Sequence, residues 1–315
     1  MTGDIAFSTI AITTLTAAVI AGTTILFAAL GEVLSERAGV LNLGVEGMML
    51  VGAVVGYIAT LTTGSPWAGI VAAAFAGGAL ASIHAALTVS LRANQVVSGL
   101  ALTLFGTGFS SFIGKPYVGV PLPNAFHKVA IPGLAKLPFV GPILFDQNPL
   151  VYLSFVLVPA LWYWLYRTRP GLNLRAVGEN PAAADAMGLN VFLTRYLYVI
   201  AGGALAGIAG AHLSLAVAPS WVEGMTAGRG WVAVALVIFA TWNPAKAILG
   251  AYLFGGVEAL TFRLQAMGST FSVFFLNMTP YLFTIAVLLI ATSRARKGRG
   301  DLPAALGTAY DREMR

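Results

Sequence analysis

Long apolar stretches recur along the chain, and short polar segments separate them. A helix needs about 20 predominantly apolar residues to cross the ~30 Å hydrocarbon core of a bilayer. One of the apolar stretches, residues 231–241, is too short to cross the bilayer alone, so we expect it to be tilted, broken or extended by its neighbours. The pattern predicts an all-α, polytopic integral membrane protein with a single transmembrane domain over residues 1–315. We count about nine stretches, within a range of eight to ten: 5–30, 48–61, 67–91, 96–113, 150–166, 196–217, 231–241, 247–262 and 275–292.

Composition supports the membrane prediction, since 58% of the residues are hydrophobic and only 10% are charged. A soluble domain carries roughly 25% charged residues. We attribute the net charge of +6 to orientation in the membrane lipid and expect no nucleic-acid partner. The absence of cysteine excludes disulfides, thiolate metal sites and iron–sulfur clusters. The first basic residue is Arg37, so residues 5–30 lack the charged start of a signal peptide and are expected to remain as a span.

The basic residues predict an orientation. We place the polar segment 167–195 and the basic tail 293–315 on the cytoplasmic side, and alternation of the spans then assigns every other loop. Thirteen basic residues fall on the cytoplasmic side and five on the outside, as the positive-inside bias requires. The C-terminus is therefore predicted to be cytoplasmic and the N-terminus extracytoplasmic.

The longest predicted extracytoplasmic segment, residues 114–147, is rich in proline. Six of the fifteen prolines of the chain lie between positions 114 and 142. This density opposes regular structure and favours an ordered, extended cap. The cap is either a lid over the helix ends or a docking surface for an extracytoplasmic partner.

Two pairs of glycines at G-x-x-x-G spacing, Gly52/Gly56 and Gly203/Gly207, are typical of helices that approach each other closely. We expect these pairs to pack within the chain rather than to form a dimer face.

Motifs of enzymatic chemistry are absent from the sequence. It has no G-x-x-x-x-G-K-[ST] loop for ATP, no H-E-x-x-H and no G-x-S-x-G. We therefore predict no enzyme, no cofactor and no metal, and any uphill transport must draw energy from an ion gradient or another subunit. The ionisable residues inside the predicted spans are Glu46, Glu258, His84 and His212. They are few for an ion relay, and we expect the two histidines to be structural.

Within the polar segment 167–195, the run NPAAADAMG predicts one miniature helix. Asn180 suits the N-cap, Pro181 the first helical position and Gly188 the left-handed stop. A helix this short is unstable alone, so it needs a surface to lie on. Its alanine faces would allow another protein to approach its backbone. The alternative is a solvated loop with a nascent helix.

The run AAADAMG at residues 182–188 resembles the E-A-A-x-x-x-G coupling motif of ATP-binding-cassette (ABC) importer permeases. Ala182 stands where the strict motif has glutamate, and Glu179 lies three residues earlier. This form of the motif is similar to the one in the branch of the family that contains branched-chain amino-acid, ribose and nucleoside permeases. The resemblance implies that a cytoplasmic coupling helix docks into a cleft of an ATPase subunit. The implied docking residues are Gly178, Glu179, Asn180, Pro181, Ala182, Ala183, Ala184, Asp185 and Gly188.

Two further segments, residues 31–57 and 228–260, are similar to nucleoside-type permeases of this branch. The resemblance implies a permease subunit in the bacterial inner or plasma membrane. Its implied partners are an ATPase subunit, a second related permease and an extracytoplasmic solute-binding lipoprotein. The alternative solutes are simple sugars and branched-chain amino acids. An ion-coupled secondary transporter and a structural or assembly membrane protein are the alternatives of other classes.

Residues 31–47 hold several polar side chains between apolar stretches, and three glycines interrupt any helix there. Irregular backbone at membrane depth is tolerated where it lines a cavity or is buried in protein. Asn42 and Glu46 are four residues apart and are predicted to share a face along the translocation pathway. The alternative is a polar hinge that seals the helix ends.

Overall fold

The computed structural model describes residues 2–267 and 302–313, together with positions 272, 275, 278, 279, 281–286 and 289. Within these residues seven helices are long and apolar enough to span a membrane, which confirms the prediction of a helical, multi-pass membrane protein. The predicted stretch 231–241 corresponds to a shorter helix, and the stretch 275–292 lies largely outside the described residues. The count of about nine spans is thus reduced to seven long helices and a short one within the described part. The helices are α1 (Thr2–Arg37), α2 (Val45–Thr63), α3 (Pro66–Ala85), α4 (Gln95–Gly114), α5 (Val140–Leu144), α6 (Pro149–Arg167), α7 (Arg169–Glu179), α8 (Pro181–Ala186), α9 (Val191–His212), α10 (Arg229–Phe239) and α11 (Pro244–Ala266).

Local capping explains where many of these helices begin. The three Asn-Pro pairs at 148–149, 180–181 and 243–244 each start a helix, and each asparagine side chain accepts a hydrogen bond from a backbone N–H of the first turn. Asparagine supplies the acceptor that the free N–H groups need, and proline at the next position lacks an N–H that would otherwise be unpaired. Two π-helical turns, Ala86–Ser90 and Leu213–Val217, extend α3 and α9.

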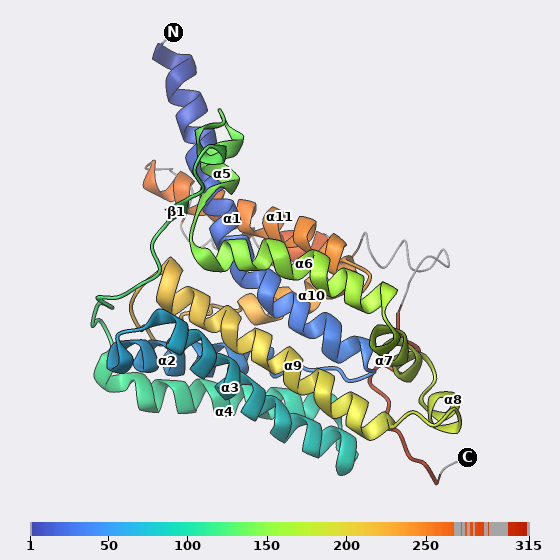
Figure 1. Ribbon diagram of the computed structural model, residues 1–315. Helices are drawn as coiled ribbons and strands as arrows, with labels where there is room; N and C mark the ends of the chain where they lie inside the picture. Colours follow the sequence, from blue (N-terminus) through green and yellow to red (C-terminus); the bar gives the residue numbers. More distant parts are fainter. Residues whose placement is uncertain are drawn as a thin grey trace.

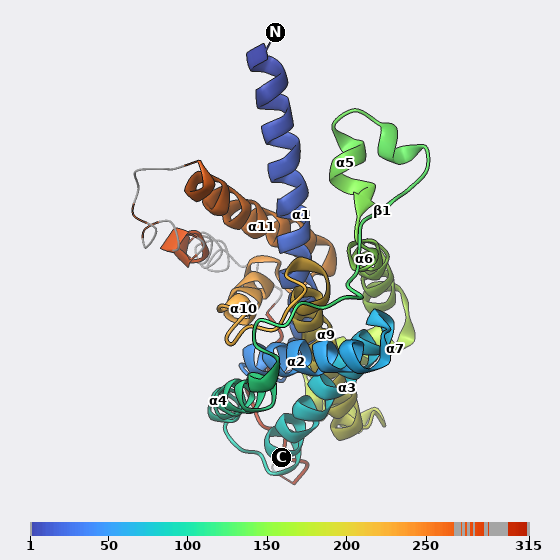
Figure 2. The same ribbon diagram turned by 90° about the vertical axis from the view of Figure 1, so that its left-hand side faces the viewer.

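Helix α9 lies in the middle of the molecule, between α1 on one side and α2 and α3 on the other (Figure 1). Helix α4 packs on α2, and α11 runs against α1 (Figure 2). Helices α7 and α8 and the C-terminal residues gather at one end of the bundle, which we call the α8 end. The opposite end carries the Pro-rich segment and the first turns of α1.

The central position of α9 depends on glycine. Gly207 of α9 and Gly52 of α2 meet backbone to backbone, and a Cβ added at Gly52 would lie 2.7 Å from the carbonyl carbon of Gly207. Gly203 lies equally close to α3, since its Cβ would be 2.7 Å from the Gly77 carbonyl oxygen. The prediction that these G-x-x-x-G glycines pack within the chain is confirmed.

The Pro-rich segment has little regular structure, as predicted. It contains two 3₁₀ turns (Lys115–Tyr117 and Leu134–Lys136), the short helix α5 and the two-residue strand β1 (Val129–Ala130), which pairs antiparallel with β2 (Asp146–Gln147). Its first part covers the end of α9, where Leu122 N donates to Pro219 O at 2.9 Å and Phe126 N donates to Leu215 O at 2.9 Å. The part around β1 and α5 projects beside the first half of α1 (Figure 2). The segment thus includes both a cover over helix ends and a projecting hairpin.

We expect Gly207→Ala to destabilise the protein by about 1–3 kcal/mol, because the added methyl would lie 2.9 Å from the Ala73 carbonyl carbon, within a packed backbone contact. The matched control is Gly108→Ala on α4, where a Cβ meets nothing within 4 Å. The control should be neutral or more stable by about 0.5–1 kcal/mol, because alanine is the better helix former. Thermal unfolding in detergent measures both, and equal melting temperatures would contradict the packing role of Gly207.

Candidate functional site

The α8 end is built from two short helices in series. Thr168 begins α7, its Oγ1 accepting from Gly171 N at 3.3 Å, and α7 ends at Asn180. The same Asn180 begins α8, with its Oδ1 accepting from Ala183 N at 2.9 Å. Gly188 ends the turn with φ of +84°, in the left-handed region. The predicted cap, first-turn proline and glycine stop are therefore confirmed, whereas α7 was not predicted.

Helix α8 presents two different faces. Ala182, Ala183 and Met187 are exposed, and Met187 is 84% exposed. Ala184 is only 4% exposed and packs in a small cluster with Val177 and Val191. The predicted docking residues therefore divide into an outer set and an inner set. The outer set is Glu179, Asn180, Ala182, Ala183 and Gly188; Pro181 and Asp185 are half-buried, and Gly178 and Ala184 are buried.

The inner face of α8 rests on the C-terminal segment 302–313 of the same chain. Tyr310 packs on the cluster around Ala184, and Arg312 Nε lies 2.9 Å from Asp185 Oδ2. Ala305 N donates to Gly178 O at 2.9 Å. The surface that a helix this short needs is thus supplied within the chain, and Ala184 supports α8 from inside rather than facing a partner.

The same C-terminal segment joins other parts of the α8 end. Gly307 N donates to Gly39 O at 3.3 Å, and Arg195 Nη1 donates to Thr308 O at 3.1 Å. Asp311 forms an ion pair with Arg92, which lies between α3 and α4. The segment therefore connects the turn after α1, the α3–α4 loop, α7, α8 and the start of α9.

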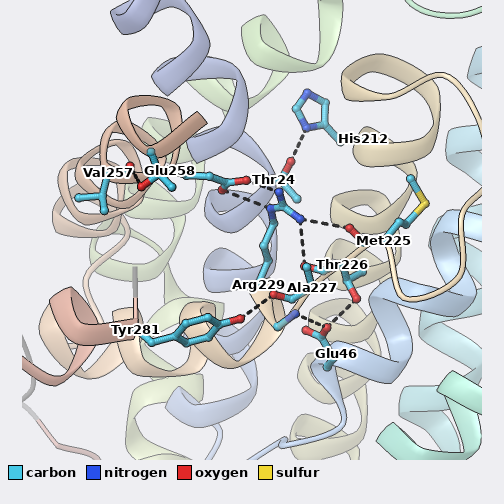
Figure 3. A network of polar contacts seen from close by, with 12 residues as sticks. Thr24, Glu46, His212, Met225, Thr226, Ala227, Arg229, Val257, Glu258 and Tyr281 are labelled. Atoms are coloured by element: carbon cyan, nitrogen blue, oxygen red, sulfur yellow. Dashed lines mark hydrogen bonds and ion pairs between the residues drawn. The ribbon is translucent and has the colours of Figure 1, made fainter. Parts of the chain in front are cut away.

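A second polar centre lies between α2 and α10 and is built on Glu46. The carboxylate of Glu46 accepts hydrogen bonds from Thr226 Oγ1 at 2.6 Å, Gly228 N at 2.8 Å and Gly230 N at 2.7 Å (Figure 3). Gly228 is the N-cap of α10, so this carboxylate caps α10 from another helix. A negative charge at a helix N-terminus is favourable because it pairs with the free N–H groups and the positive end of the helix dipole.

Arg229, the first residue of α10, continues this network on the other side. Its Nη1 donates to the carbonyl oxygens of Met225 and Thr226, both at 3.1 Å. Its Nε and Nη2 form a two-point ion pair with Glu258 of α11. The hydroxyl of Tyr281 donates to Ala227 O at 2.8 Å (Figure 3). The turn 225–230 is thus held by α2 on one side and by α11 and Tyr281 on the other.

Asn42 and Glu46, the predicted pathway pair, are both buried and serve separate local structures. Asn42 Oδ1 accepts from Gly44 N at 3.0 Å, and its Nδ2 lies 3.5 Å from Met48 Sδ. Asn42 is 0% exposed and Glu46 is 7% exposed. Their contacts support the alternative, a polar hinge that seals helix ends. They do not favour a surface that a solute touches.

The two histidines within the predicted spans are engaged as well. His84 bonds to Ser98 Oγ at 2.9 Å and to Leu41 O at 3.0 Å, and His212 bonds to Thr24 Oγ1 at 2.8 Å. These contacts confirm that both histidines are structural.

Two buried carboxylates were missed at the sequence level because residues 31–47 were treated as one interrupted segment. Helix α1 in fact continues to Arg37, so Glu32 and Glu36 lie one turn apart inside it, and each is 1% exposed. Trp242 Nε1 donates to Glu36 Oε2, whereas neither oxygen of Glu32 has a hydrogen-bond partner among the described residues. The signal that was available is their i, i+4 spacing in a segment without proline.

We expect Glu46→Gln to lower stability by about 1.5–3 kcal/mol, the usual range for hydrogen bonds to a charged group. Glutamine keeps one acceptor oxygen but turns an NH₂ group toward backbone donors that need an acceptor. Glu223→Gln is the control, because Glu223 is exposed in the loop before α10. Melting temperatures in detergent measure both variants. An unchanged melting temperature together with lost solute uptake would contradict the capping role and restore the pathway role.

Comparison with known proteins agrees with this architecture. The fold is similar to that of a solved ABC transporter described as metal-chelate type, in an inward-facing conformation, with a TM-score of 0.51 and 15% identity over 89% of this chain and 84% of that chain. At this identity the likeness concerns the fold alone.

Three relatives match over nearly their whole length. A Haloferax volcanii ABC transporter permease named for glucose is 47% identical over 95% of this chain and 98% of its own. The guanosine permease of Bacillus subtilis is 36% identical over 91% of this chain and 92% of its own. The nucleoside permease of Lactococcus lactis is 36% identical over 89% of this chain and 92% of its own.

Residues 14–292 match the family described as the permease component of branched-chain amino acid transport systems. This match covers most of the chain. A permease component explains both the many spans and the missing ATP-binding loop, because it crosses the membrane and leaves ATP binding to another subunit. The chain belongs to this family of ABC transporter permeases and is a transport subunit without catalytic activity of its own.

Proposed function

We propose that this chain is the permease subunit of an ABC importer for nucleosides and that α8 is its coupling helix. The observation that carries the coupling role is the outer face of α8. Ala182 and Ala183 leave the helix backbone open to a partner, while Tyr310, Arg312 and the inner cluster hold the helix in place. A helix held in this way can transmit a push from an ATPase to the spans, because α7 and α9 are joined to it directly.

This proposal orients the molecule and its partners. The α8 end and the tail 293–315 face the cytoplasm with the C-terminus, and the whole chain forms one permease domain in the plasma membrane. Two ATPase domains act with this chain and a second related permease. Exposed apolar side chains on α4, among them Leu104, Phe105 and Phe112, suit membrane lipid or that second permease.

An extracytoplasmic lipoprotein delivers the solute at the opposite end. The projecting hairpin of the Pro-rich segment supports this role because it exposes several apolar residues in a loop rather than in a span. They are Val129, Leu134, Leu137, Phe139 and Val140, each 44–57% exposed. A surface of this kind needs a partner to cover it.

Nucleosides are the proposed solute because two kinds of similarity agree on them. The segment GVLNLGVEGMML is similar to nucleoside-type permeases, and two relatives at 36% identity are named for guanosine and for nucleosides. Glucose is the second candidate, favoured by the 47% identity to the Haloferax permease. Both solutes are neutral and carry several hydroxyl groups.

We expect Ala182→Trp to abolish docking of the ATPase without loss of folding, because Ala182 is exposed and a large side chain there keeps the partner from α8. Overpacking at a close contact costs about 1–3 kcal/mol or more. Ala245→Trp is the matched control, since Ala245 is also exposed, also follows an Asn-Pro cap and lies at the same end. The measurement is the ATPase recovered per permease after gentle purification. Full recovery with Ala182→Trp would mean that this face of α8 is a solvated surface.

Competition among solutes tests the nucleoside proposal. Uptake of labelled guanosine by cells with the complete importer should be blocked by unlabelled nucleosides and left unchanged by glucose or leucine. Uptake of labelled glucose without uptake of labelled guanosine would assign the solute to simple sugars and leave the ABC importer assignment intact. Uptake of labelled leucine without uptake of labelled guanosine would assign it to branched-chain amino acids.

A further inference from the structure

A cavity of about 330 Å³ lies between α1, α10, α11 and Tyr281, beside the turn that Glu46 caps. This volume is at the lower end of the range for small-molecule sites, ~300–1,000 Å³. Its walls combine apolar side chains with one ion pair. The lining residues on which the inference depends are Ala227, Arg229, Phe254, Glu258, Phe262 and Tyr281.

The polar wall of the cavity is the Arg229–Glu258 ion pair. Their side chains are 17% and 15% exposed, so the pair lies at the border of the cavity rather than fully within packed protein. Each oxygen of Glu258 accepts one hydrogen bond from Arg229. A carboxylate has about four lone-pair sites, so Glu258 can still accept hydrogen bonds from the hydroxyl groups of a solute.

The apolar wall is aromatic. Phe254, Phe262 and Tyr281 border the cavity, and Phe254 is fixed by an edge-to-face contact with Phe283 at 5.0 Å between ring centroids. Tyr281 is held by its bond to Ala227 O. Apolar and aromatic walls with a few fixed polar groups are typical of small-molecule sites. Such rings suit the flat face of a base or the C–H face of a sugar.

The ion pair also needs a physical reason to be within the spans. Charged residues at membrane depth are costly, and they commonly border solute pathways or pair with one another. An ion pair that only holds α10 against α11 does not need an open space beside it. It would stabilise the two helices equally well if side chains filled that space. Among the described residues the space beside the pair is open, and Ala227 of the turn 225–230 lines it.

We propose that this cavity binds the hydroxylated ring of a neutral solute, the ribose of a nucleoside or a hexose. Glu258 accepts from the ring hydroxyls, and Phe262 and Tyr281 cover the apolar face. This inference rests on the proposed function, and it assigns the site at which the permease itself contacts the solute. The cap from Glu46 positions the turn that forms one wall of this site.

Cysteine protection tests the site directly, because the chain has no cysteine of its own. Ala227→Cys places one thiol on the cavity wall, and Val222→Cys is the control, 50% exposed in the same loop and outside the cavity. Thr261→Cys, a close match in size on the cavity wall, replaces Ala227→Cys if that variant loses uptake. The assembled importer is labelled with a maleimide in the presence of guanosine, glucose or neither.

At ten times its Kd, a bound solute should slow labelling of the cavity thiol about tenfold, because mass action leaves roughly one site in eleven free. The control thiol should react at an unchanged rate. Protection by guanosine assigns a nucleoside, and protection by glucose assigns a hexose. Equal labelling under all conditions, in a variant that still takes up solute, would overturn the site and leave the proposed function standing. Absence of uptake of either solute by the unaltered importer would instead overturn the proposed function.

Discussion

The carboxylate of Glu46 satisfies the backbone donors at the start of α10, and much of the structure depends on this contact. Helix α10 begins within the bundle, and its first N–H groups need acceptors there. Thr226, Gly228 and Gly230 donate to Glu46, so α2 fixes where α10 starts. Once α10 is fixed, Arg229 reaches Glu258 on α11 and the cavity between these helices acquires its polar wall.

The α8 end shows how a helix too short to fold alone is held in place with one face open, the face on which we propose that the ATPase docks. Its inner face rests on Tyr310 and Arg312, and its outer face stays open. The same C-terminal segment bonds to Gly39, directly after α1. Helix α1 also carries Ile25, which lines the cavity. One helix therefore connects the proposed coupling surface with the proposed solute site, which gives movement of α8 a physical route to the spans.

Local features could be predicted from the sequence because their causes are local. The Asn180 cap, Pro181 and the glycine stop are determined within nine residues, and the apolar stretches predict the spans by length alone. Helix α7 was missed because its residues are mostly polar, although Thr168 and Pro170 are a usual start signal. The predicted first stretch ended at residue 30, but α1 continues through Gly31, which packs closely against Gly202 of α9, and ends at Arg37.

The site could be predicted only in part, because its key contacts join distant residues. The burial of Ala184 depends on Tyr310, far along the sequence, and the environment of Glu46 depends on residues about 180 positions later. Neither pairing leaves a periodic pattern. The residue type of Glu46 was still informative. A glutamate next to an interruption of a span indicates a place where buried backbone N–H groups need an acceptor.

Uptake into proteoliposomes tests whether this permease imports its solute with energy from an ATPase docked on α8. The liposomes hold the complete importer with its binding lipoprotein, and labelled guanosine uptake is followed with ATP at the ATPase side or with a proton or sodium gradient and no ATP. We expect accumulation with ATP and none with either gradient. Accumulation driven by a gradient without ATP would contradict import driven by the ATPase.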